Sequence, residues 1–405
     1  MTAEALVGAV IFDGDRRHDG AALLIEAGQV VAIVAAAAVP PSATRVDLDG
    51  GWLAPAFVDA QVNGGGGALF NASPASATLE TIAAAHRKFG VAALLPTLIT
   101  TTPTIERAAI DVVARAVKAT PGIAGLHLEG PHLAPSRHGA HPAAWMRPLE
   151  DDDVDRLVAI RETVGTLLVT LAVEQAPPAR IRRLADHGVV VSLGHSDAGY
   201  EAARRAFDAG ARGVTHLFNA MSPLRHREPG LVGAALEAGN IWCGVIADGV
   251  HVHPAALRIA LRAKRGPGRI FFVTDAMPTV GSDLDEFDLE GRRVRRRDGV
   301  LALDDGTLAG SDLDMAAAVR HAIGALECTP EEALRMASRY PARCLGLQDR
   351  FGTIAPGRRA DLVHLDADWR VRRTWMAGVA SAPADAQPGR TDPAARDTAA
   401  RRPSR

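Results

Sequence analysis

The sequence predicts an α/β protein: a (β/α)₈ barrel of TIM type, accompanied by a small β-sandwich domain that both chain ends form. Short apolar segments alternate with Ala- and Arg-rich helical segments from about residue 53 to residue 338, a pattern typical of βα repeats and a parallel sheet. Eight such apolar segments occur, and polar residues gather at their ends. The 405 residues exceed the roughly 250 that one barrel needs, which leaves room for a second domain.

Each of the eight expected strands is short and dominated by apolar side chains. They are residues 56–62, 93–98, 123–128, 167–173, 189–193, 213–216, 243–247 and 270–274. The polar residues at or just after their ends are Asn63, Thr97, Glu129, Glu174, His195, His216, Asp248 and Asp275. In a closed parallel barrel the carboxyl ends of all strands lie on one face, where barrel enzymes carry their catalytic groups. The sequence therefore predicts one polar face, and it favours a barrel over a doubly wound sheet.

The sequence pattern differs in the two flanks of the barrel, where short strand-like segments are separated by Gly and Asp. We expect residues 1–52 and 346–380 to form the two parts of one small β-domain beside a catalytic barrel of residues 53–345. Residues 381–405 are rich in Ala, Pro, Asp and Arg and contain few large apolar side chains. Such a composition predicts a disordered tail.

Charge and cysteine content narrow the class of protein. Lys and Arg number 45 against 47 Asp and Glu, so no global basic field indicates nucleic acid or an anionic membrane as a partner. Any phosphate must then be held by a local site. Three widely spaced cysteines without a C-x-x-C pair indicate a reducing, cytoplasmic setting. The sequence has no secretory signal pattern and no apolar run near the roughly 18 residues that a membrane span needs.

Three motifs place a candidate metal ligand at the end of an apolar segment. They are G-L-H-L-E-G-P with Glu129, S-L-G-H-S with His195 and V-T-H-L-F-N-A-M with His216. Two imidazoles and one carboxylate leave a coordination position open, as in catalytic Zn²⁺ sites. Each residue alone has an ordinary structural explanation, but three of them on one barrel face favour a metal centre. His127 shares the strand face of Glu129, and we expect it to fill the barrel lumen or to contact a metal ligand, rather than to bind the metal itself.

Asp275 follows the last expected strand, in the segment F-F-V-T-D-A. There it would face the same barrel mouth as the metal ligands and act as a general acid and base, taking a proton from a metal-bound water. The alternative is a helix N-cap, since aspartate is common at a turn between a strand and a helix.

Several polar residues near the same mouth are candidates for substrate recognition. The guanidinium of Arg227 suits a pair of phosphate oxygens, and Asn219 with the backbone amide of Ala220 offers further donors. His251 would polarise a carbonyl oxygen, and His141 would hold a sugar hydroxyl. A surface arginine and structural histidines are the alternatives.

The glycine-rich run of residues 63–67 superficially suggests a phosphate-binding loop. It lacks both the Lys-Ser/Thr ending of a Walker motif and the strand, turn and helix context of G-x-G-x-x-G. We expect a flexible loop with its backbone near the site.

An ordered series of segments from about residue 53 to residue 365 resembles the N-acetylglucosamine-6-phosphate deacetylases of the amidohydrolase superfamily. These segments are D-A-Q-V-N-G-G-G-G, G-L-H-L-E-G-P, G-A-H-P, L-G-H-S, T-H-L-F-N-A-M, R-E-P-G-L-V-G, I-A-D-G-V-H-V, V-T-D-A, L-A-G-S and Y-P-A-R. So many matches in order are far more specific than any single motif.

The resemblance implies that Glu129, His195 and His216 bind the metal and that Asp275 is the catalytic acid and base. It also implies a homodimer and a set of substrate contacts. With Gln61 added as a further candidate, the expected substrate-binding residues are Gln61, Ala140, His141, Asn219, Ala220, Arg227, His251, Leu308, Ala309 and Gly310.

One departure from the wider superfamily concerns the number of metal ions. Many amidohydrolases carry His-x-His after the first strand, whereas this chain has Gln61, Val62 and Asn63. An amide replaces an imidazole ligand poorly, so we expect one divalent ion per subunit. Zn²⁺ is the expected ion, with Fe²⁺, Mn²⁺ and Co²⁺ as alternatives.

The expected reaction is hydrolysis of the acetamide of N-acetyl-D-glucosamine 6-phosphate to D-glucosamine 6-phosphate and acetate. Two alternatives stay open. The first is a deacetylase for N-acetylgalactosamine 6-phosphate or another amide. The second is a catalytically silent barrel that binds a sugar phosphate, although the presence of Asp275 beside three metal ligands argues against it.

Overall fold

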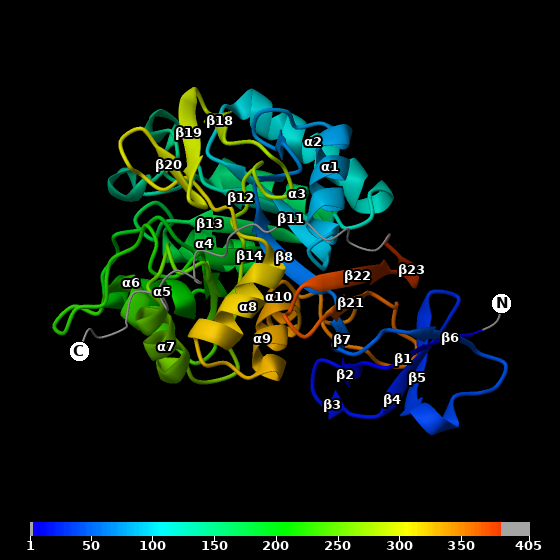
Figure 1. Cartoon of the computed structure of the whole chain (residues 1–405). Coiled ribbons are helices and arrows are strands. Elements are labelled where there is room, and N and C mark those ends of the chain that lie inside the picture. The colour runs from blue at the N-terminus through cyan, green and yellow to red at the C-terminus, as the bar shows by residue number, and fades with distance from the viewer. Residues whose placement is uncertain (1–2, 382–405) are drawn as a thin grey trace, which may run out of the picture.

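The computed structural model of the chain describes residues 3–381. A helix-covered barrel lies beside a β-sandwich, and a small antiparallel sheet stands over one end of the barrel (Figure 1). The tail expected at residues 381–405 lies outside the described residues, apart from residue 381. Among the described residues, no helix is both long and apolar enough to cross a bilayer.

Eight parallel strands form the barrel in the order of the sequence, so the predicted fold is confirmed. They are β8 (Phe57–Val62), β11 (Val91–Ile99), β12 (Leu126–Glu129), β13 (Leu167–Leu171), β14 (Val190–Leu193), β15 (Gly213–Val214), β16 (Trp242–Val245) and β17 (Ile270–Phe272). The first and last strands meet through a parallel bridge between Val62 and Ala276. These strands are buried on both faces, which explains their nearly continuous apolar sequences.

Helices connect and cover the strands. They are α1 (Ser76–Arg87), α2 (Pro103–Ala119), α3 (Asp151–Val164), α4 (Pro178–Asp186), α5 (Tyr200–Asp208), α6 (Gly230–Glu237), α7 (Pro254–Ala263), α8 (Met315–Ala325), α9 (Pro330–Ala337) and α10 (Arg339–Cys344), with short 3₁₀ turns at η1 (Ala36–Ala38), η2 (Pro135–Arg137) and η3 (Ala143–Trp145). Local sequence signals set several of their starts. Thr102 caps α2 by accepting a hydrogen bond from the amide of Ile105, and Asp314 caps α8 in the same way through Ala317.

The β-sandwich is made from both ends of the chain. One sheet contains β1 (Glu4–Val7), β4 (Ala21–Glu26), β5 (Gln29–Ala35) and β6 (Thr44–Asp47), and the other contains β2 (Val10–Phe12), β3 (Arg17–His18), β7 (Trp52–Pro55), β21 (Leu362–Leu365), β22 (Val371–Met376) and β23 (Val379–Ala380). Leu6, Leu23, Leu53 and Trp375 meet in the core between them. Strand β7 pairs with β21, so the chain passes from the sandwich into the barrel just after Pro55.

Two features near the barrel mouth differ from the sequence expectations. The glycine-rich run does not form a loop: β9 (Gly64–Gly65) pairs with β10 (Ala68–Leu69), and a Cβ on Gly64 would lie only 2.5 Å from the carbonyl oxygen of Ala68. A three-stranded sheet of β18 (Glu286–Leu289), β19 (Arg292–Arg297) and β20 (Val300–Leu303) follows β17 and was not predicted. Its alternation of polar and apolar residues, such as Asp288 before Leu289, was the available signal.

Candidate active site

Four of the predicted site residues lie at the carboxyl ends of barrel strands. Glu129 ends β12, while His195, His216 and Asp275 follow β14, β15 and β17 by two or three residues. The last three have positive φ angles of 47°, 32° and 52°. Non-glycine residues rarely adopt this conformation, and such strain concentrates at functional sites. The turns after these strands therefore hold the three side chains in fixed directions toward the barrel axis.

The structure brings the three expected metal ligands together. Glu129 Oε1 lies 3.0 Å from His216 Nε2 and 3.3 Å from His195 Nε2, and the two imidazole nitrogens are 3.2 Å apart. His195 Nδ1 donates to the carbonyl oxygen of Arg137 at 2.7 Å, so its Nε2 carries a free lone pair. Two imidazole nitrogens and a carboxylate oxygen, all buried and this close, fit a divalent transition-metal ion.

His141 is a fourth group at this position. Its Nε2 lies 3.8 Å from Glu129 Oε2, and by distance alone Glu129, His141 and His195 also form a possible ligand set. The amide of Thr100 donates to His141 Nδ1 at 3.3 Å, so this nitrogen accepts and the proton sits on Nε2. His141 therefore presents an N–H group rather than a lone pair to the site. This tautomer favours His216 as the third ligand and leaves His141 as a hydrogen-bond donor.

The pKa values of the Glu129 and Asp275 carboxyl groups are shifted in opposite directions. Burial alone would raise the pKa of Glu129, but the hydrogen bonds with His195 and His216 hold it well below its usual value. Burial, followed by the nearby charge of Glu129, raises the pKa of Asp275 to about 6. One carboxylate thus stays ionised as a ligand would, while the other can exchange a proton near neutral pH.

Asp275 is held by side-chain amides and caps no helix. Asn63 Nδ2 and Gln61 Nε2 donate to its Oδ1 at 2.7 and 3.1 Å. The N-cap alternative is wrong, because the next helix in the chain is α8, whose N-cap is Asp314. The chain after Asp275 instead runs into the inserted sheet. The carboxyl group is therefore not used as a helix cap, and it lines the cavity at the barrel mouth.

A cavity of about 410 Å³ opens above these groups. Its walls contain the four residues at the strand ends and seven of the expected substrate contacts, which are Ala140, His141, Asn219, Ala220, His251, Leu308 and Gly310. Sequence reasoning missed other lining residues, among them Ser136, Arg137, Met277, Leu289 and Thr307. Leu289 comes from the inserted sheet, which therefore forms part of the wall.

Comparison with known proteins identifies the family. The model of the amidohydrolase family matches residues 52–388. This chain is an amidohydrolase. The N-acetylgalactosamine-6-phosphate deacetylase of Shewanella sp. (strain ANA-3) is 46% identical over 82% of this chain and 83% of its own length. The human N-acetylglucosamine-6-phosphate deacetylase is 41% identical over 82% of this chain and 84% of its own length. The family expected from the sequence is thus confirmed.

Solved structures give the same result for the fold. The N-acetylglucosamine-6-phosphate deacetylase of Pasteurella multocida superimposes on the amidohydrolase chain with a TM-score of 0.90 at 33% identity, covering 94% of this chain and 100% of that one. A variant of the Mycobacterium smegmatis enzyme in complex with N-acetyl-D-glucosamine-6-phosphate has a TM-score of 0.87 at 35% identity and covers 94% and 99%.

Three expected substrate contacts of the amidohydrolase do not line the cavity. Arg227 is exposed on the loop before α6, and in the described part of the chain no hydrogen bond or ion pair involves its side chain. That loop is held at Glu228, whose carboxylate accepts from the amide of Tyr200 at 2.7 Å. Ala309 is fully buried and packs with the apolar face of the inserted sheet. Gln61, the third, lies beneath the cavity floor.

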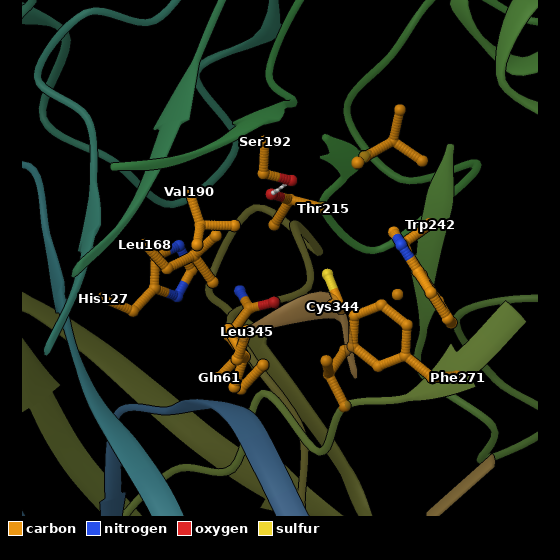
Figure 2. Close-up of a pocket in the computed structure, with 15 residues that line it drawn as sticks. Gln61, His127, Leu168, Val190, Ser192, Thr215, Trp242, Phe271, Cys344 and Leu345 are labelled. Atoms are coloured by element: carbon orange, nitrogen blue, oxygen red, sulfur yellow. Dashed lines mark hydrogen bonds between the residues drawn. The ribbon is translucent and has the colours of Figure 1, made fainter. Parts of the chain in front are cut away.

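Gln61 connects the two carboxyl groups of the site. Its Nε2 donates to both oxygens of Glu129 at 3.2 Å and to Asp275 at 3.1 Å. Its side chain is 1% exposed and points into a second cavity of about 20 Å³ in the barrel lumen, bordered by residues such as Ser192 and Phe271 (Figure 2). Gln61 does not line the larger cavity. Gln61 therefore links the two carboxyl groups by hydrogen bonds and does not form part of the cavity wall.

Hydroxyl groups and one histidine fill the lumen around that small cavity. His127 contacts Thr170 Oγ1 through Nε2 at 2.8 Å and Thr97 Oγ1 through Nδ1 at 3.2 Å. Thr170 in turn contacts Thr215 at 2.7 Å, next to the Ser192 and Thr215 pair drawn in Figure 2. Both ring nitrogens of His127 thus contact threonine hydroxyls within the lumen.

Asp248 orients His251 at the cavity wall. Its carboxylate lies 2.6 Å from His251 Nδ1 and accepts from the amides of Val250 and His251, each at 2.9 Å. Burial would raise the pKa of Asp248, but the contacts with His251 lower it. The carboxylate stays ionised and accepts a hydrogen bond from the Nδ1–H group of His251, so Nε2 is the nitrogen available to a ligand. The sequence analysis placed Asp248 at a strand end but did not predict that it orients His251.

Proposed function

We propose that this amidohydrolase hydrolyses the acetamide of N-acetyl-D-glucosamine 6-phosphate to D-glucosamine 6-phosphate and acetate. The observation that carries the proposal is Asp275, a buried carboxyl group with a pKa raised to about 6 beside the convergent Glu129, His195 and His216. Relatives named as deacetylases of amino-sugar phosphates support the substrate class.

The proposed mechanism uses Asp275 as the proton carrier. A divalent ion held by Glu129, His195 and His216 would polarise the amide carbonyl and make a bound water acidic. Asp275 accepts a proton from the attacking water and returns it to the leaving amine, which cannot depart as an unprotonated anion at neutral pH. His251 would polarise the amide oxygen, and the Nε2–H group of His141 would hold a sugar hydroxyl.

We propose one divalent ion per subunit, with Zn²⁺ as the ion. The donor set of two imidazoles and a carboxylate suits Zn²⁺, and it also suits Fe²⁺, Mn²⁺ or Co²⁺. Gln61 and Asn63 stand where a second ion would need imidazoles, and their amides donate to Asp275. The amide nitrogens thus face the carboxylate, an arrangement that opposes a second cation.

The phosphate is proposed to lie toward Asn219 and Ala220. Arg227 is exposed on the loop outside the cavity, so as the proposed cationic contact it would have to extend its side chain from that loop toward the phosphate. Phe218 and Ala220 have positive φ angles of 81° and 50°, and Asn219 and Ala220 line the cavity. Leu308, Ala309 and Gly310 would border the sugar on the other side, although Ala309 could do so only through its backbone.

The galactosamine epimer is the second candidate substrate. Relatives named N-acetylgalactosamine-6-phosphate deacetylase are 46% and 38% identical to this chain. Acetate release should therefore be measured from both 6-phosphate epimers and from unphosphorylated N-acetylglucosamine, with the metal-loaded protein. We expect the highest kcat/KM with N-acetyl-D-glucosamine 6-phosphate. A higher value for the other epimer would reassign the substrate, and no release from any of them would favour a sugar-phosphate-binding barrel without activity.

We further propose a cytoplasmic homodimer that acts on a small molecule. Cys243 and Cys344 are buried as free thiols, which suits a reducing compartment. Light scattering coupled to gel filtration tests the dimer, and a monomer at micromolar concentration would contradict it.

A further inference from the structure

Asp59 is a buried carboxyl group that takes no part in the mechanism above. It lies on β8, two residues before Gln61, and is 0% exposed. Its Oδ2 accepts a hydrogen bond from the hydroxyl of Thr274 at 2.6 Å. Its Oδ1 accepts from the amides of Thr274 and Gln61, each at 3.2 Å. Asp59 does not border the larger cavity, so these contacts do not serve substrate binding directly.

The three contacts lie where the barrel closes. Neighbouring strands elsewhere in the barrel are joined by ladders, but β17 ends at Phe272, and the order of the sheet places β17 and β8 at its two ends. Beyond Phe272 the two sides meet through the bridge between Val62 and Ala276. Backbone amides also cross the junction: Asp275 donates to the Gln61 carbonyl, and Asn63 and Gly64 donate to the Ala276 carbonyl, each at 2.9 Å. Asp59 therefore adds side-chain hydrogen bonds to a junction where β17 and β8 form no regular strand ladder.

This junction carries three polar groups of the candidate site, Gln61, Asn63 and Asp275. Asp275 directly follows Thr274 and has a φ angle of 52°. Its direction thus depends on where the peptide of Thr274 is held. A displacement of about 1 Å at a reacting group can cost roughly a hundredfold in rate.

We propose that Asp59 is a positioning residue for the deacetylation: by holding Thr274 and the amide of Gln61, it fixes the carboxyl group of Asp275 opposite the metal ligands. This inference rests on the proposed function, because its test measures deacetylase activity.

Asparagine should replace Asp59 with little loss. Burial raises the pKa of Asp59 to about 7, so the neutral and ionised forms both occur near neutral pH. A neutral side chain keeps all three contacts if Oδ1 accepts the two amides and the other atom donates to Thr274 Oγ1. Leucine has a similar size but accepts nothing, so it removes the junction contacts without opening a large cavity.

The test compares Asp59→Asn, Asp59→Leu and Thr274→Val in the full-length, metal-loaded protein. For Asp59→Leu we expect kcat to fall roughly tenfold to a hundredfold, with KM and metal content close to wild type. Asp59→Asn should stay within about threefold of wild type, since a hydrogen bond is kept at each position. Thr274→Val, which keeps the shape and loses the hydroxyl, should also lower kcat. Combined with Asp59→Leu it should add little, because both changes interrupt the same contact.

Asp361→Leu is the matched control. Asp361 is 7% exposed and accepts from the amide of Ala377 at 2.9 Å and from Arg359 Nε at 2.6 Å, but it directly precedes β21 of the β-sandwich and does not line the cavity. Its loss should lower Tm without changing kcat of the folded enzyme. The positioning role is overturned if Asp59→Leu behaves like this control. If Asp59→Leu does not fold, an unchanged kcat in Thr274→Val overturns it. Wild-type protein that releases no acetate would refute the proposed function instead.

Discussion

At the scale of single residues, the geometry of the site depends on backbone conformations that non-glycine residues rarely adopt. His195, His216 and Asp275 all have positive φ angles. Each follows a barrel strand whose last residues are buried, so the surrounding core can enforce the strained turn. Residue types at strand ends could be predicted from the sequence, since apolar segments define the strands. Their roles in metal binding and catalysis stay predictions until variants are measured.

Asp275→Asn tests the role of the proton carrier. Asparagine keeps the shape of the side chain but cannot accept and return a proton, so kcat should fall by at least roughly a hundredfold. Because Glu129, His195 and His216 are unchanged, metal content should stay near one equivalent. Steady-state kinetics, elemental analysis and Tm on one preparation measure the three quantities. Turnover near wild type in a metal-replete variant would overturn the mechanism.

Arg227→Ala tests phosphate recognition. Loss of a charged hydrogen bond is worth about 1.5–3 kcal/mol, or roughly tenfold to a hundredfold in kcat/KM for the phosphorylated substrate. Activity on the unphosphorylated sugar should hardly change, so the preference for the phosphate should shrink. Arg225→Ala on the same exposed loop is the control. An unchanged preference in Arg227→Ala would remove this residue from the phosphate site.

At the scale of elements, the sheet of β18, β19 and β20 is the main addition to the predicted barrel. Its buried Leu289 and Val294 pack with Met277 and with Ala140, which borders the cavity. The guanidinium of Arg292 donates to the carbonyl oxygen of Ala140, next to His141. The sheet thus holds the segment that presents His141 to the site.

Arg292→Ala should therefore weaken substrate binding more than chemistry. A hydrogen bond from a charged group contributes about 1.5–3 kcal/mol, so KM should rise roughly tenfold to a hundredfold with little change in kcat or metal content. Arg293→Ala is the matched control, because Arg293 is exposed and its guanidinium lies 3.8 Å from Glu286. Equal KM values for the two variants would show that the sheet does not position His141.

At the scale of the whole molecule, the metal centre joins strands from distant parts of the sequence. Glu129 and His216 are 87 residues apart and come from β12 and β15. A ligand that binds the native state alone stabilises it against unfolding. Bound metal should therefore raise the free energy of unfolding by linking these strands across the barrel.

Removal of the metal should lower Tm. At a metal concentration 1,000-fold above Kd the stabilisation is about 4 kcal/mol, which corresponds to a shift of at least several degrees. Differential scanning calorimetry with and without a chelator measures the shift, and Glu129→Gln, which lacks a ligand, should respond little. Elemental analysis of the wild-type protein should find one equivalent. Two tightly held equivalents would contradict a single metal ion per subunit.

The sequence by itself determined the barrel, the sandwich at its flanks and the amidohydrolase family. Strand periodicity and motif order are local properties, so they can be read along the chain. The tertiary structure alone decided that Gln61 lies below the substrate cavity, that Arg227 lies outside it and that Asp59 holds the closing strands. These outcomes depend on which side chains meet across the barrel and on how the last strand joins the first. Such contacts join residues more than 200 positions apart, as Asp59 and Thr274 show, and no local pattern encodes them.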